Sequence, residues 1–391
     1  MRYCKSNDLV PGMVLAKSLY SDKNELLLAS GNELTEKLIK RIRQLEYSHV
    51  CIEQEGTEDI IIGDIIDEPL LRKARKLLID LFEGVIHESK KRSCESHEDL
   101  IKDLQTSNYV VPIDGIRKVV GEIVDEMLLK DGTYWDAIPE AFSKRVRIIH
   151  GVDTAILSIL MGIWYSFSRN ELDQLGLGAI LHDLGLALMP DIAWKRRDDY
   201  KSDEVEHYLK HPEFGAKLLE NHKAALHVVI QCLLQHHERQ DGGGFPQGLR
   251  GNHKLPTKKV KRSPDEIFRF AEIISVADAY INLTNGTWSE TALSPEDALT
   301  YMNEELSSML NKSIISALSR IVVRFPAGVT VSIEECSNNH YVGFRGVVAK
   351  PNLADPHRAT VILIADAENR KIEPIPADFR AEKNARIRMI I

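Results

Sequence analysis

Histidine and aspartate residues gather in one stretch of this 391-residue sequence, where they could bind metal ions. Nine of the 14 histidines fall between residues 150 and 253, where an even spread would place roughly four. His182-Asp183 and His236-His237 each follow an apolar run, and Asp278 ends a third one. An unpaired imidazole or carboxylate at the end of a buried helix costs several kcal/mol. A shared metal site would satisfy these side chains together.

The types of these side chains indicate which metals and which reaction to expect. Imidazoles and carboxylates without thiolates suit Fe, Mn or Zn in a catalytic site, and do not suit a closed, cysteine-rich structural zinc site. Two metal ions that share a bridging carboxylate would hold a hydroxide against a phosphorus centre and stabilise the leaving oxygen. The five cysteines are scattered without a C-x-x-C pair, which indicates reduced thiols rather than a disulfide framework.

The motifs around these residues resemble one family. His182-Asp183 is the doublet that names the HD phosphohydrolase superfamily, and residues 236–246, HHERQDGGGFP, are similar to the HHExxDGxGYP signature of its HD-GYP subfamily. Residues 150–158 resemble the helix that carries the first ligand histidine of that subfamily, and residues 211–215 resemble its HPxxG element. The resemblance covers about residues 146 to 286.

This resemblance implies a helical, metal-dependent hydrolase that opens cyclic di-GMP or a related cyclic dinucleotide. The cofactors would be two divalent transition-metal ions, Fe or Mn. Two ions rather than three are expected, because the glutamate that binds a third ion in some members is Val146 here. Asp183 would bridge the two ions and is the expected catalytic residue. The implied ligands are His150, His182, Asp183, His211, His236, His237 and Asp278.

The signature loop, residues 236–246, carries further candidates. Glu238 and Asp241 are expected to orient the loop rather than bind metal, and a signalling-protein partner could contact its surface. The remaining loop residues in the prediction are Gly242, Gly244, Phe245 and Pro246, where Phe245 replaces the tyrosine of the signature.

Several positions depart from the family pattern. The lysine expected to touch substrate phosphate is Leu186, a second aspartate is Ile281, and two arginines are Thr287 and Glu290. Charge-assisted phosphate contacts contribute about 1.5–3 kcal/mol each, so their loss would weaken binding. Candidate replacements for substrate binding are Lys195, Arg196 and Arg197, and the basic run 258–262, for which a solvated loop is the simpler interpretation.

The other histidines of this stretch have weaker claims. His207 lies four residues before His211, a spacing that would allow a metal pair on one helix face, although the family match selects only His211. His222, His227 and His253 are expected at the surface or in the core, outside the site.

The spacing of apolar residues predicts a mainly α fold with four parts: an α+β module over 1–58, a helical connector over 59–133, the HD-GYP metallohydrolase domain over 134–320 and a β-rich module over 321–391. Expected strands are 13–16, 26–29 and 49–52 in the N-terminal module, and 329–333, 343–348 and 359–364 in the C-terminal one.

Composition excludes several classes of protein. Hydrophobic residues make up 43% and charged residues 28% of the chain, which is ordinary for a globular protein. The net charge of −8 argues against non-specific nucleic-acid binding. The N-terminus lacks the apolar segment of a secretory signal, and the longest apolar run, 152–167, is too short to span a membrane. We expect a cytoplasmic protein without membrane insertion.

Three functions are compatible with the sequence. The leading hypothesis is a phosphodiesterase that converts cyclic di-GMP to linear pGpG, to GMP or to both. The second is a catalytically weak or inactive HD-GYP module that regulates a partner, suggested by the altered phosphate-contact positions. The third is an HD hydrolase that acts on a different phosphorylated substrate. Metal content separates the second hypothesis from the others, and a substrate panel separates the first from the third.

Overall fold

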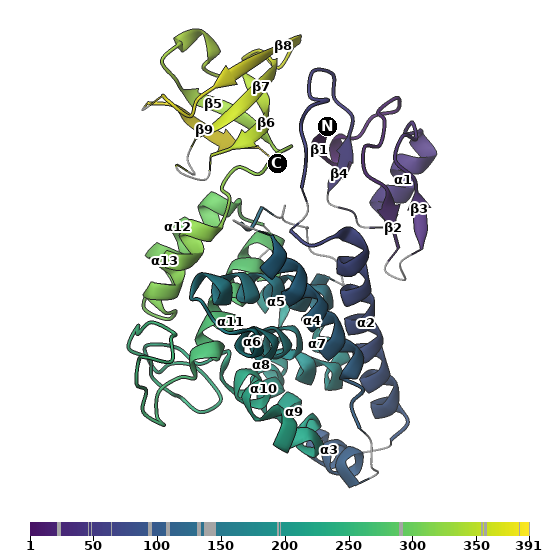
Figure 1. Cartoon of the computed structure of the whole chain (residues 1–391). Coiled ribbons are helices and arrows are strands. Elements are labelled where there is room, and N and C mark those ends of the chain that lie inside the picture. Colours follow the sequence, from purple (N-terminus) through teal and green to yellow (C-terminus); the bar gives the residue numbers. More distant parts are fainter. Residues whose placement is uncertain are drawn as a thin grey trace.

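A helical body with a small module at each end of the chain makes up the protein (Figure 1). The computed structural model describes residues 1–390 except 22–24, 46, 48, 64, 93–95, 107–109, 131–133, 137–145, 194, 196, 289–291, 353–354, 356–357 and 383. The architecture confirms the predicted mainly α fold class. No helix among the described residues is long and apolar enough to span a membrane.

The N-terminal module combines two small sheets with one helix. Its elements are β1 (Arg2–Lys5), β2 (Leu19–Tyr20), β3 (Leu26–Leu28), α1 (Glu36–Gln44) and β4 (His49–Ile52). β1 pairs with β4 and β2 with β3, both antiparallel. The Thr35 side chain caps α1 by accepting a hydrogen bond from the Leu38 N–H. Ile39 and Ile42, three residues apart, turn one face of α1 into the module's core.

One predicted strand of this module is wrong. Residues 13–16 make only isolated bridges, Val14 to Glu33 and Leu15 to Ile52. Because the two residues pair with different neighbours, no continuous ladder forms. The strand Arg2–Lys5 was not predicted from the sequence. Its first residue, Arg2, pairs with Ile52, 50 residues further along the chain.

Three long helices follow, and they pack as part of the helical body. They are α2 (Glu68–Lys90), α3 (His97–Thr106) and α4 (Asp114–Leu129). Buried side chains from Ile66 to Val322 form one continuous hydrophobic cluster, so the segment predicted as a connector shares its core with the helices that carry the histidines.

The remaining helices surround the histidines and aspartates. They are α5 (Val146–Trp164), α6 (Arg169–Leu181), α7 (Pro190–Ala193), α8 (Ser202–Tyr208), α9 (His211–Leu218), α10 (Lys223–Gln235), α11 (Arg269–Asn285), α12 (Pro295–Glu304) and α13 (Lys312–Ile321), with short 3-10 helices η2 (Leu184–Leu188), η3 (Arg197–Asp199) and η4 (Glu220–His222). α6 begins with a capping box between Ser168 and Glu171. α11 is buried along almost its whole length, which places Asp278 in the interior.

The C-terminal module is a five-stranded antiparallel sheet. Its strands are β5 (Thr330–Glu335), β6 (Arg345–Pro351), β7 (Ala359–Ala365), β8 (Lys371–Asp378) and β9 (Arg386–Met389), in the order β8-β7-β6-β5-β9. The three predicted strands correspond to β5, β6 and β7. The two edge strands were not predicted, because β8 contains Pro374 and Pro376 and β9 has only four residues. Proline is tolerated at a sheet edge, where a ladder hydrogen bond is not needed.

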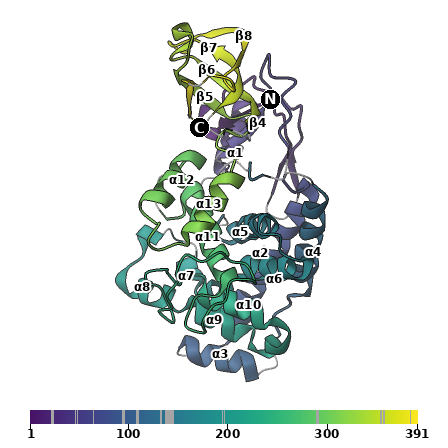
Figure 2. The same cartoon turned by 60° about the vertical axis from the view of Figure 1, so that its left-hand side comes forward.

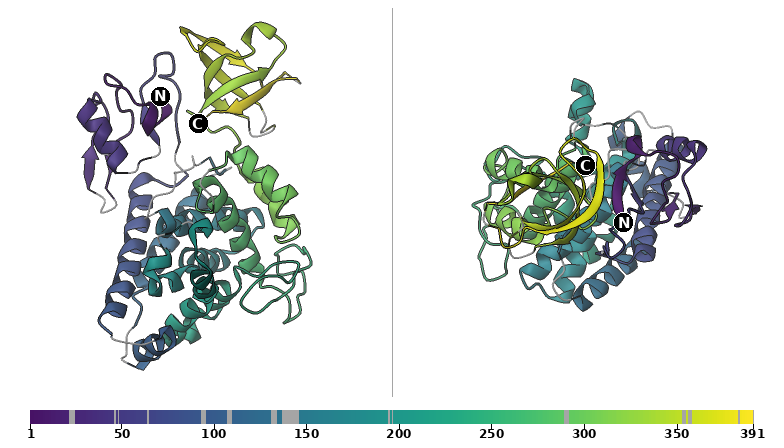
Figure 3. Two further views of the ribbon diagram at one scale, coloured as in Figure 1. Left: turned by 180° about the vertical axis from the view of Figure 1, so that it is seen from behind. Right: turned by 90° about the horizontal axis from the view of Figure 1, so that it is seen from above.

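The two end modules lie side by side at one end of the helical body (Figures 1 and 2). The Tyr3 N–H donates to the Gly328 carbonyl at 2.9 Å, and Lys371 pairs with Glu55 at 2.7 Å. The two chain termini therefore lie close to each other, as the rear and top views also show (Figure 3).

Candidate metal centre

All seven predicted ligands come together inside the helical body. Their ligand atoms form two groups, and within each group the atoms lie within 4.8 Å of one another. Six of the side chains are buried, and His237 is half-buried. The first group is His150, His182 and Asp278, and the second is Asp183, His211, His236 and His237.

Helix ends supply most of these side chains. His182 ends α6 and Asp183 follows it, His211 begins α9, and His236 ends α10. His150 and Asp278 project from within α5 and α11. Because apolar side chains hold each helix in one core, the polar residues at the helix ends converge on one point.

The two carboxylate oxygens of Asp183 face different groups. Oδ1 lies 3.1 Å from the His211 Nε2 and 3.7 Å from the His236 Nε2. Oδ2 lies 3.5 Å from the His150 Nε2 and 3.6 Å from the His182 Nε2. Asp183 therefore stands between the groups with one oxygen directed to each, the arrangement that a bridging ligand needs.

Hydrogen bonds to the backbone fix the tautomers of three histidines. The Nδ1 atoms of His182, His211 and His236 lie 2.6–2.8 Å from the carbonyl oxygens of Ala179, Tyr208 and Leu233. A carbonyl only accepts, so each Nδ1 carries a proton, and Nε2 is the ring nitrogen left to bind a metal ion.

Several of the Nε2 atoms face one another. The Nε2 atoms of His211 and His236 are 3.2 Å apart, and so are those of His150 and His182. Two neutral rings that face each other in this way repel unless a proton or a metal ion lies between their Nε2 atoms. The types of these side chains, the free direction of their Nε2 atoms and their burial fit divalent metal ions.

The charges inside the cluster shift several pKa values. Burial raises the pKa of Asp183, but the neighbouring charge of His182 and bonds from His211 and His236 hold it well below its usual range. Burial lowers the pKa of His182, but the carboxylates of Asp183 and Asp278 outweigh burial and raise it to about 9, so a metal ion that binds at Nε2 must displace a proton there. Burial and the other imidazoles lower the pKa of His236 and of His237. The carboxylates are therefore ionised at neutral pH, as metal ligands must be.

A second layer of residues orients Asp278, and the sequence analysis missed it. The Asn282 side-chain amide donates to the Asp278 carboxylate at 2.7 Å, and the hydroxyl of Thr287 bonds in turn to the side-chain oxygen of Asn282. Asn282, one helical turn after Asp278, was within reach of pattern analysis. Thr287 stands where the family pattern has an arginine, and it is fully buried, so it supports the site from behind.

Tyr208 is a second residue that the sequence analysis did not single out. Its hydroxyl lies 3.1 Å from the His237 Nε2, and its ring lies 4.7 Å from that of His211. Since its carbonyl also accepts the bond from His211, one residue positions two candidate ligands.

The signature loop is held by its own carboxylates. Glu238 accepts the N–H groups of Gln247 and Leu249 at 2.6 and 2.8 Å, and Asp241 accepts that of Gly243 at 2.9 Å. A Cβ on Gly244 would lie 2.4 Å from the backbone nitrogen of Arg239. The loop can therefore fold back on itself only with glycine at this position.

The aromatic residue of the loop meets a candidate ligand. Phe245 stacks on His237 with ring centroids 4.6 Å apart. The loop thus covers the less buried of the two ion positions.

The candidate substrate-binding cations have different surroundings. Lys195 pairs with Glu204, and Arg197 is exposed with its guanidinium 5.5 Å from the Trp288 ring. Arg196 and Glu290 lie outside the described residues. Whether Lys195 and Arg197 contact a substrate stays a prediction.

The basic run 258–262 is exposed at Lys258, Lys259 and Lys261, as expected of a solvated loop, and two of its cations form ion pairs. Lys258 pairs with Glu171 at 3.3 Å and Arg262 with the buried Glu272 at 2.6 Å. The Gln240 amide donates to the other oxygen of Glu272 at 2.7 Å. These pairs anchor the run and the signature loop to α6 and α11.

The other positions singled out from the sequence lie outside the two ligand groups. Leu186 is 1% exposed in the hydrophobic core, so it does not line an open site. His207 and His227 are exposed and His222 and His253 half-buried, and none of the four belongs to either ligand group.

Part of this chain is similar in sequence to a known domain family and to several phosphodiesterases. Residues 161–313 match the family model described as HD domain. A cyclic di-GMP phosphodiesterase response regulator, RpfG, of Xanthomonas campestris is 27% identical over 188 residues, which cover 48% of this chain and 44% of that protein. A cyclic di-GMP phosphodiesterase of Pseudomonas aeruginosa is 23% identical over 216 residues, covering 55% and 49%. A 3'3'-cGAMP-specific phosphodiesterase of Vibrio cholerae is 30% identical over 89 residues, covering 22% and 17%.

The matches are partial. This chain spans about half the length of the first two relatives.

Proposed function

From the HD domain that this chain carries, we propose that it is a metal-dependent phosphodiesterase that hydrolyses cyclic di-GMP at a two-metal site. The products would be linear pGpG, GMP or both, and the metals Fe or Mn. One observation carries the proposal: Asp183 presents one oxygen to each of two histidine groups, and within each group two Nε2 atoms face each other at 3.2 Å.

The residues of this chain would divide the work. His150, His182 and Asp278 would hold one ion and His211, His236 and His237 the other, with Asp183 shared between them. Bound there, the ions would supply the nucleophile and neutralise charge on the phosphate. Asn282 and Thr287 keep the Asp278 carboxylate in one orientation, and Tyr208 keeps His237 in place.

The half-buried side of the centre is where a substrate would enter. His237 is the least buried of the ligands, and Phe245 stacks on it from the signature loop. A nucleobase could contact this aromatic surface. Lys195 and Arg197 are the cations that we propose for substrate phosphate, and the outer surface of the signature loop is the proposed contact for a signalling protein.

A second candidate is a weakly active or inactive module that binds the dinucleotide. It is favoured by the burial of Leu186, because this position cannot supply the positive charge that the family pattern has there. A third candidate, hydrolysis of another cyclic dinucleotide, is supported by the similarity to a 3'3'-cGAMP-specific enzyme.

A substrate panel with a matched pair of variants tests the proposal. The protein is loaded with Mn or Fe under anaerobic conditions, and its metal content is measured. It is then incubated separately with cyclic di-GMP, 3'3'-cGAMP and cyclic di-AMP. We expect about two ions per chain and linear product from cyclic di-GMP. Asp183→Ala should lose the product by several orders of magnitude, while Asp80→Ala, an exposed carboxylate on α2, should retain it.

Each outcome selects one candidate. Two bound ions with no product from any dinucleotide would refute the enzyme in favour of the binding module. Product from 3'3'-cGAMP or cyclic di-AMP, without product from cyclic di-GMP, would refute cyclic di-GMP as the substrate. Activity retained by Asp183→Ala would refute the bridging role.

A further inference from the structure

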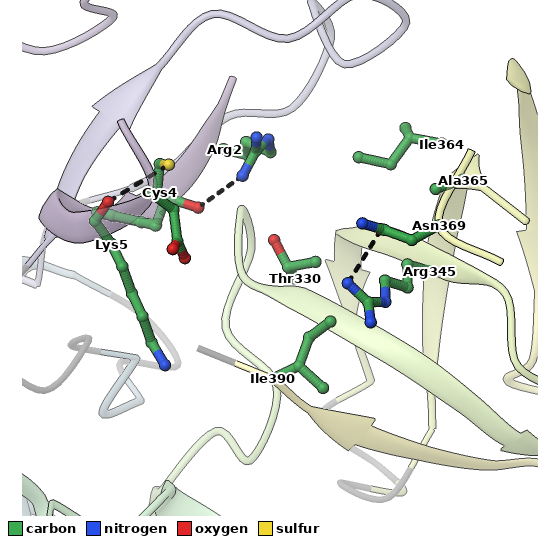
Figure 4. A pocket seen from close by; sticks show the side chains of 11 residues that line it. Arg2, Cys4, Lys5, Thr330, Arg345, Ile364, Ala365, Asn369 and Ile390 are labelled. Carbon is green, nitrogen blue, oxygen red and sulfur yellow. Dashed lines mark hydrogen bonds between the residues drawn. The ribbon is translucent and has the colours of Figure 1, made fainter. Parts of the chain in front are cut away.

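A cavity of about 370 Å³ lies between the first strand of the chain and the C-terminal sheet (Figure 4). Arg2 and Lys5 of β1 line it from one side, and Arg345 of β6 and Asn369, before β8, from the other (Figure 4). Thr330 lies between the two sides. Its volume is within the range of about 300–1,000 Å³ typical of small-molecule sites.

The cavity has an excess of positive charge. Arg2, Lys5 and Arg345 line it together with one carboxylate, Asp8. Among the described residues, none of these three cations forms an ion pair with a carboxylate. The guanidinium of Arg2 bonds to the Gln54 amide oxygen and that of Arg345 to the Asn369 amide oxygen, both at 3.0 Å.

Several other cations of the same modules form ion pairs. Lys371 pairs with Glu55, Arg370 with Asp366, Arg380 with Asp378 and Arg386 with Glu334. At the cavity, by contrast, three cations that have no carboxylate partner among the described residues come together from two modules. An anion between them would remove their mutual repulsion.

The lining also indicates the kind of anion. Guanidinium groups suit phosphate, since they donate two parallel hydrogen bonds, and the Thr330 hydroxyl and the Asn369 amide are further donors. Ile364, Ala365 and Ile390 add an apolar surface that an inorganic ion would leave unused. We propose that this cavity binds a small organic phosphate of nucleotide size.

Such a ligand would also join the two modules. Arg2 belongs to the N-terminal module and Arg345 to the C-terminal one, and direct contacts between the modules include the bond from Tyr3 to Gly328 and the pair Lys371–Glu55. A phosphate held by both arginines would strengthen this junction. None of the metal-ligand candidates lines the cavity, so the proposal does not depend on the proposed catalytic function.

Calorimetric titration of the full chain with GMP, after removal of metal by a chelator, tests this proposal. Chelation prevents metal-bound phosphate at the other site from contributing. We expect saturable binding that weakens with added salt, and a loss of about tenfold or more for Arg2→Met or Arg345→Met.

Two variants serve as controls. Arg380→Met removes an exposed arginine of the same module that is paired with Asp378, and Lys371→Met removes a contact between the modules without altering the cavity lining. Both should bind GMP as the unchanged chain does. Circular dichroism and melting curves of all four variants identify any that fails to fold. The test requires only that the two cavity variants, Arg2→Met and Arg345→Met, are folded.

Two further ligands separate the contributions. Guanosine should bind much more weakly than GMP, because it lacks the phosphate, and inorganic phosphate should bind more weakly than GMP, because it lacks the apolar body. Equal binding of guanosine and GMP would overturn the phosphate assignment, and binding of inorganic phosphate without GMP binding would overturn the organic ligand. No GMP binding at millimolar concentration, or binding unchanged in both cavity variants, would overturn the site itself.

Discussion

Gly185 is the position where one methyl group should disturb the metal centre most. It lies in η2, two residues after Asp183, where the backbone of η2 touches that of α9. A Cβ built on Gly185 would lie 1.9 Å from the His211 carbonyl oxygen and 2.8 Å from the Gly215 nitrogen. Both neighbours are backbone atoms, so no side chain can rotate away to make room.

The size of the effect follows from this geometry. The Cβ needs about 1.1 Å more room to reach 3.0 Å, the closest approach that real Cβ atoms make. Asp183 directly precedes η2, and His211 begins α9. The Oδ1 of Asp183 lies 3.1 Å from the Nε2 of His211. Metal–ligand distances tolerate only about 0.2 Å. We therefore expect Gly185→Ala to cost about 3 kcal/mol in the free energy of unfolding and to weaken metal binding about tenfold to a hundredfold.

Metal content and thermal unfolding, each measured with and without Mn, check this prediction. The control is Gly84→Ala in α2, where a Cβ would meet nothing within 4 Å. This variant should be unchanged or more stable by about 0.5–1 kcal/mol, since alanine favours helix. If Gly185→Ala bound metal and melted as the unchanged chain does, η2 and α9 would not hold the bridging aspartate against His211, and the reasoning would be refuted.

Three further predictions concern pH, the core and the ions. Burial raises the pKa of Glu171, but bonds from Ser168 and Arg269 lower it to about 2, from 4.5. Because its pKa is lower in the folded than in the unfolded chain, the ionised Glu171 stabilises the folded state. This stabilisation is complete above about pH 4.5 and is lost as the pH falls towards 2. Glu171→Gln should thus cost roughly 3 kcal/mol at pH 7 and flatten the acid limb of the stability curve; an unchanged acid limb contradicts this. Leu186→Lys places an unpaired ammonium in the core. It should lower the free energy of unfolding by roughly 3 kcal/mol or more and should not tighten cyclic di-GMP binding. Ligand titrations and melting curves of both forms check this, and tighter binding with an unchanged melting curve would contradict it. Removing metal with a chelator should lower the melting temperature, because the facing Nε2 atoms of His211 and His236 then repel each other, and Mn should restore it; identical melting curves would show that no ion binds there.

Much of the candidate site could be predicted from local sequence. His182-Asp183 and His236-His237 stand directly after apolar helices, so the pattern of each helix alone predicts that these polar side chains lie at the end of a core helix. The resemblance to the HD-GYP signature then added His150 and His211, whose own surroundings are less distinctive. The mainly α class and three strands of the C-terminal sheet were equally local properties.

Short and irregular elements were not predictable in this way. β8 carries two prolines and β9 only four residues, and each is a strand because β7 or β5 offers it a partner. Residues 13–16 had the pattern of a strand, but they found no single partner along their length.

The sequence by itself determined which residues could bind metal, because residue type and helix periodicity are written locally along the chain. Only the tertiary structure decided that Asp183 directs one oxygen to each histidine group, that Leu186 is in the core, and that Lys258 and Arg262 pair with buried carboxylates. It also placed Arg2 opposite Arg345. These relations join residues that are tens to hundreds of positions apart, and they depend on how whole helices and modules pack, which no local pattern encodes.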